Sequence, residues 1–104
     1  MATTTKAIAR TAAATTSTTL YTVPTTTTIT VVSNIVLANA ATSASTATIA
    51  FDGVTIVPAV SIPANSVVGF DMKQVIPANA TPKIITGFAS TTAVTIHLSG
   101  VEIS

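Results

Sequence analysis

Hydrophobic and polar residues alternate along most of the chain after residue 19, and Val, Ile and Thr occur at many positions of both kinds. These β-branched side chains are stiff at χ1 and fit a pleated sheet better than a helix. Five prolines divide the chain into pieces too short for long helices. The pattern predicts seven strands, over residues 20–23, 28–39, 46–51, 54–57, 66–72, 83–89 and 93–103.

The clearest local signal is the sequence FDGV at 51–54. It predicts a two-residue hairpin loop, because Asp-Gly readily takes the two positive φ angles of a type I′ turn. This loop pairs Phe51 with Val54. The next pair on the same face is Ile49 with Ile56, and we expect that face to line the core.

The run 28–39 alternates without a polar face. Ile29, Ile35 and Leu37 fall on one side, while Val32 and Val36 fall on the other. The outer face of a small sandwich is ordinarily polar, so apolar residues there indicate cover from another subunit or from the N-terminal segment. The candidate subunit-interface residues are Val32, Val36, Ile8, Thr28 and Thr30.

Threonine-rich stretches such as TTTTIT at 25–30 fit this interpretation. A threonine face favours β-structure and forms hydrogen bonds without charge. It can therefore meet a neighbouring subunit without the desolvation cost that Lys or Glu would bring.

The later strands carry three further signals. In 93–103, Val94 and Leu98 share one face, and the apolar set continues at Val101 after a change of phase at Gly100, which predicts a bulge there. The tetrapeptide IPAN occurs at 62–65 and at 76–79 and predicts two turns. All three phenylalanines fall in phase with core positions: Phe51, Phe70 and Phe88.

The N-terminal residues differ in composition, being mainly Ala, Thr and Ser with Lys6, Ile8 and Arg10. Such a segment frays, forms a short strand or orders on a neighbour. We expect an N-terminal arm over 1–18 that reaches a neighbouring subunit. Because 104 residues hold one core, we expect a single β-sandwich or jelly-roll domain over 19–104.

Charge is scarce: 7% of residues are charged, and the net charge is +1. Four scattered basic residues do not make the cluster that phosphate binding requires, so nucleic acid is not an expected partner. The uncharged stretch 11–51 is broken by Pro24 and rich in Thr, Ser and Asn, so it does not predict a membrane helix. Low charge together with 48% hydrophobic residues favours self-association.

No residue pattern predicts catalysis, a metal or a cofactor. Cysteine is absent and His97 is the only histidine, placed by the alternation on the polar face with Thr95. Asp52 is explained by its turn, and the spacing of Asp71 and Glu102 does not indicate a paired-carboxylate site. We expect that the protein is not an enzyme.

Three segments together resemble a group of small structural proteins of tailed-phage virions. They are LYTVPTTTTITVVSNIVLANAATSASTATIAFDGV at 20–54, SIPANSVVGFDMKQV at 61–75 and GFASTTAVTIHLSGVEIS at 87–104. The resemblance covers the chain from about Leu20 to its end and rests on turn and strand motifs. It implies a β-sandwich without catalytic residues, placed on a capsid or in a tail or fibre.

From this resemblance we expect a capsid decoration protein that binds and stabilises the assembled shell. It would form a homo-oligomer, with a trimer favoured, bind the major capsid protein, assemble in the host cytoplasm and end up on the capsid surface. The alternative is a tail-tip or fibre module that contacts host glycan, although the chain has few aromatic residues for sugar stacking. A third reading is an ice-binding or adhesin-like surface protein.

Overall fold

The computed structural model describes residues 3–23, 28–77 and 83–103. Within these ranges all regular secondary structure is β-strand. The same ranges contain no helix that is long and apolar enough to cross a membrane. The strands are β1 (Thr3–Ala12), β2 (Thr18–Thr22), β3 (Ile29–Asn39), β4 (Ser45–Phe51), β5 (Val54–Ile62), β6 (Ser66–Ile76), β7 (Ile84–Ala89) and β8 (Val94–Ile103).

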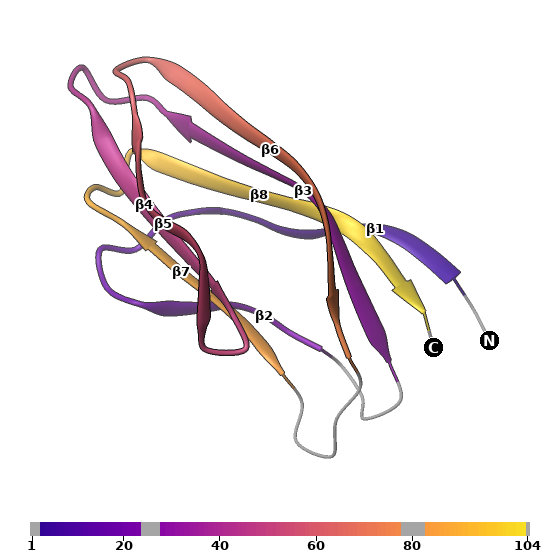
Figure 1. The fold of residues 1–104 in the computed structure, drawn as a ribbon. Coiled ribbons are helices and arrows are strands. Elements are labelled where there is room, and N and C mark those ends of the chain that lie inside the picture. The colour runs from indigo at the N-terminus through magenta and orange to yellow at the C-terminus, as the bar shows by residue number, and fades with distance from the viewer. Residues whose placement is uncertain (1–2, 24–27, 78–82, 104) are drawn as a thin grey trace.

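The strands form two antiparallel sheets that pack face to face (Figure 1). Sheet A has the order β1-β8-β3-β6, and sheet B has the order β2-β7-β4-β5. The predicted all-β sandwich is confirmed, with eight strands in place of the seven expected.

The additional strand is β1, and it corrects the expectation of an N-terminal arm. β1 pairs with β8 from Thr3 opposite Ile103 to Ala12 opposite Thr95, so it forms one edge of sheet A. Ile8 of this strand is buried in the core. The segment has a single large apolar residue, which is too little to show an alternating pattern in the sequence, and the open edge of β8 supplies its hydrogen bonds.

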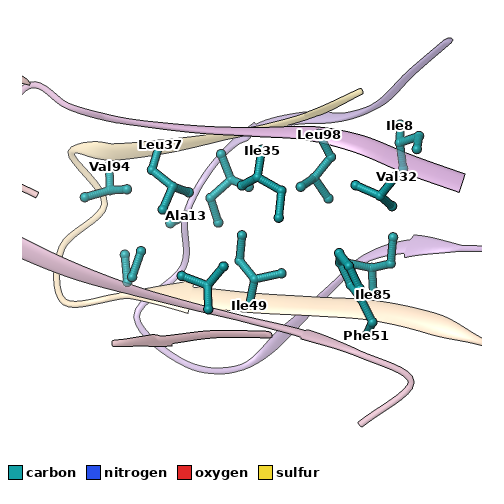
Figure 2. Packing of buried hydrophobic residues seen from close by; sticks show 14 of the residues in the cluster. Ile8, Ala13, Val32, Ile35, Leu37, Ile49, Phe51, Ile85, Val94 and Leu98 are labelled. Atoms are coloured by element: carbon teal, nitrogen blue, oxygen red, sulfur yellow. The ribbon is translucent and has the colours of Figure 1, made fainter. Parts of the chain in front are cut away.

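The core lies between the two inner faces (Figure 2). In Figure 2, Ile8, Val32 and Leu98 from sheet A lie across the core from Ile85 and Phe51 of sheet B. These side chains leave at most 8% of their surface exposed, so the chain buries a complete core by itself.

Two bulges set which residues of sheet A point inward. The register shifts between Val32 and Asn34 in β3 and between Ala7 and Ala9 in β1. Both bulges lie beside Ser99 and Gly100 of β8, whose own pairing runs without a skipped residue. The bulge predicted at Gly100 is therefore in the neighbouring strands, and β8 keeps one phase throughout.

The DG hairpin is confirmed, since Asp52 and Gly53 have φ of 54° and 77°. Phe51 pairs with Val54 as expected, but Ile49 pairs with Val57 because the register shifts in this hairpin. Val54 is 70% exposed, so the expectation that it lies in the core is wrong.

The remaining turn and aromatic predictions have mixed outcomes. Asn65 closes the first IPAN turn with φ of 51°, and the second turn extends into 78–79, outside the described residues. Phe51 is buried and Phe70 packs partly against the core. Phe88 alternates with the buried Gly87 and Ala89 and so faces outward, which makes the prediction that it lies in phase with the core wrong.

Candidate interaction surface

Within the described residues, one cluster joins charged side chains to a phenol, and it lies between the two sheets. Lys6 of β1 donates hydrogen bonds to the Tyr21 hydroxyl and to Glu102 Oε1, each over 3.1 Å. The Tyr21 hydroxyl donates to Glu102 Oε2, and Thr30 Oγ1 donates to the same oxygen over 3.2 Å. Every charge in the cluster therefore has a partner, and it links β1, β3 and β8 of sheet A to β2 of sheet B.

The pKa values of the cluster follow from these bonds. Burial alone would raise the pKa of Glu102, but the hydrogen bonds from Tyr21, Lys6 and Thr30 outweigh burial and lower it. Burial and the neighbouring carboxylate raise the pKa of Tyr21. The hydrogen bonds with Tyr21 and Glu102 raise the pKa of Lys6. The cluster therefore favours the charged forms of Glu102 and Lys6 and the neutral form of Tyr21, as expected of a cluster with a structural role.

The histidine lies where the sequence predicted, on the outer face of sheet A. Its Nε2 is 3.3 Å from the Thr95 hydroxyl, and Arg10 lies opposite His97 across the strand pair. In the described part of the chain no three His, Cys, Asp or Glu side chains come together as a metal site would require.

Four of the five candidate interface residues are inside the sandwich. Ile8, Val32, Thr28 and Thr30 are buried in the single chain, with Val32 and Thr30 fully inaccessible. For Val32 and Thr30 the reason is the bulge beside Ser33, which exchanges the inward and outward positions of β3 on its N-terminal side. These four residues are therefore unavailable to another subunit, and only Val36 lies on the outer face as predicted.

A different set of residues forms an apolar outer surface on sheet A. Val31 lies between Val101 on β8 and Val75 on β6, and Ile29 lies beside Ile103 on β8. Their partly exposed positions alternate with inward residues such as Thr30 and Ile76, so they point away from the core. We name this surface the outer band, and it consists of Ile29, Val31, Val75, Val101 and Ile103.

The outer band was not predicted from the sequence, because an unbroken alternation along β3 puts Ile29 on the same face as the core residues Ile35 and Leu37. The five side chains are β-branched and uncharged, and Val75 remains 59% exposed. Such a contiguous apolar surface is typical of a contact site for another protein.

The described part of the surface also has hollows away from the outer band. One, of about 270 Å³, lies on the outer face of sheet B, and its lining includes Phe88 together with Ser17, Thr48, Thr55 and Thr86. Another, of about 200 Å³, opens between β5 and β6 and includes Val54 and Val75 in its lining.

Comparisons with known protein families, with curated proteins and with solved structures found no match to this chain.

Proposed function

We propose that this protein is a structural component of a tailed-phage virion, a capsid decoration protein that binds and stabilises the assembled shell. The motifs of 20–104 that resemble such proteins support the proposal. Its partners would be further copies of itself, in the trimer that we expect from the resemblance, and the major capsid protein. Neither nucleic acid nor a membrane is part of the proposal.

The outer band is the observation that carries this proposal. It offers β-branched side chains from β3, β6 and β8 on one face, with no charged residue among them. A decoration protein that covers a joint between shell subunits gains affinity by burying apolar area without desolvating charges. Binding only the assembled state then stabilises the shell by mass action.

Co-sedimentation with shells tests the proposal. The purified chain should pellet with assembled shells and remain in the supernatant with unassembled capsid subunits. Shells that carry the chain should also withstand a higher temperature than bare shells before they release their contents. Equal binding to both forms, or no binding to either, would contradict a decoration role.

A second candidate is a tail-tip or fibre module that binds host glycan, and the hollow on sheet B is the observation that favours it. An aromatic ring beside several hydroxyls can stack on one face of a sugar and hydrogen bond to its edge. Glycan-array binding that is lost in Phe88→Ala would support this function. An array without binding would remove it.

A further inference from the structure

The four edge strands of the sandwich differ in how well they could accept another strand. β2 has five residues and a register shift. β5 contains Pro58 and a positive φ at Ala59, and β1 is bulged at Ile8. Proline and bulges are features that protect an edge from pairing.

β6 differs from β2 and β5 because it is long and contains neither proline nor a residue with positive φ. It runs for 11 residues, and its register against β3 shifts between Asp71 and Gln74. Inward and outward positions nevertheless alternate along it from Val67 to Val75, as its pairing with β3 shows. The half-buried Val68, Phe70 and Met72 pack only partly against the core. The outward Val67 and Val75 are 64% and 59% exposed.

The outward face of β6 also carries two opposite charges two residues apart. Asp71 accepts a hydrogen bond from Asn34 over 3.0 Å and makes no ion pair within the described residues. Lys73 is exposed and has no ion-pair partner in the same ranges. A pattern of acid, apolar residue, base is complementary to its own reverse, and reversal is the relation between two antiparallel strands.

We propose that two copies of this chain associate through antiparallel pairing of their β6 edges, with a two-fold axis at Met72. In this register Asp71 lies opposite Lys73 of the second copy, and the symmetry repeats that pair. Centring the axis on Asp71 or on Lys73 would place like charges opposite each other, which is unfavourable. Charge thus selects one register.

The apolar residues of β6 fit the same register. Met72 pairs with Met72, and Val68 pairs with Ile76, so side chains left half-covered at the edge gain neighbours on the inner face. The axis is perpendicular to sheet A, so both outer bands face the same side of one continuous sheet. The interface does not depend on a virion role. Because it is two-fold, it would join two trimers if the chain also trimerises.

A single cysteine tests the axis, since the natural chain contains none. Directly opposed residues of antiparallel strands have Cα atoms about 4.5–5.5 Å apart, within the range of a disulfide. Met72→Cys should therefore form a covalent dimer under mild oxidation. Val67→Cys is the control, because the register separates its two copies by about 33 Å. A Val67→Cys dimer that forms as fast as the Met72→Cys dimer would overturn the proposal.

Charge reversal tests the register without cysteine. Lys73→Asp and Asp71→Lys each place like charges across the axis and should raise the dimer dissociation constant by about tenfold or more in sedimentation equilibrium. The double variant Asp71→Lys/Lys73→Asp restores opposite charges and should dimerise as the natural chain does. Circular dichroism establishes that each variant is folded.

Three results would overturn the proposal: a natural chain that stays monomeric at millimolar concentration, single reversals that leave the dissociation constant unchanged, or a double variant no better than the singles. Shell binding is measured separately. Its loss with dimerisation intact would count against the proposed function alone.

Discussion

Gly100 of β8 lies so close to the main chain of Val31 in β3 that a Cβ atom at position 100 would overlap the Val31 carbonyl oxygen. The Ile8 side chain of β1 approaches the same position from the other neighbouring strand. The glycine thus lies beside the two bulges of sheet A and permits the close approach of strands that they require.

Gly100→Ala should destabilise the protein by more than about 3 kcal/mol, because backbone overlap cannot be relieved by a rotamer change. Gly69→Ala is the matched control, since the nearest atom to its Cβ would be 3.9 Å away. It should change stability by no more than about 0.5 kcal/mol. Urea unfolding of both variants measures the difference, and equal stabilities would contradict the described packing.

Ile8→Ala should cost about 2–4 kcal/mol, since Ile8 is a buried core residue of an integral edge strand. Ala7→Thr, at the exposed neighbouring position, should stay within about 0.5 kcal/mol. If residues 3–12 were a detached arm, neither change would alter the midpoint of thermal unfolding.

The cluster around Glu102 makes stability dependent on pH at both extremes. The pKa of Glu102 is lowered in the folded state, so its stabilising contribution is complete at neutral pH and is lost as the pH falls below its ordinary value of 4.5. The pKa values of Lys6 and Tyr21 are raised, so their contributions are lost as the pH rises above 10.5 and 10.0.

Glu102→Gln should be less stable than the natural chain at pH 7, and the difference should shrink towards pH 3. Chemical unfolding at a series of pH values measures this. Asp71→Asn, at an exposed position, is the control and should show little change. A constant difference across the series would show that the Glu102 charge does not contribute.

Gly53→Ala should destabilise the DG hairpin by about 1 kcal/mol through its backbone alone, because φ is 77° and no atom lies within 4 Å of the added Cβ. Asp52→Asn keeps a residue that tolerates positive φ and loses only the exposed ion pair to Lys83, so it should cost less than about 0.5 kcal/mol. A larger loss for Asp52→Asn than for Gly53→Ala in thermal unfolding would contradict this account.

Much of the fold could be predicted from the sequence, because the alternation of β-branched residues and the DG turn reflect local preferences of the chain for strands and for a hairpin. What alternation cannot show is an extra residue in a strand. The bulge beside Ser33 exchanged the two faces of β3, which turned the predicted interface residue Val32 into core and brought Val31 to the surface. The cluster around Glu102 could not be predicted either, since its partners Lys6 and Tyr21 lie on strands far away in sequence.

Val101→Lys should abolish shell binding while leaving the sandwich folded, because it places a charge within the outer band, on the side away from the core. Thr86→Lys, on the outer face of sheet B, is the control and should bind as the natural chain does. Co-sedimentation with assembled shells measures both variants. Equal binding by the two would remove the outer band from the mechanism.

The central claim is that the chain is a component of the capsid surface. Quantitative mass spectrometry of purified particles, with the major capsid protein as the internal reference, measures its copy number directly. A ratio comparable to that of the major capsid protein is the predicted result, since a decoration protein follows the shell lattice. A trace ratio would contradict the claim and favour the tail-tip or fibre function.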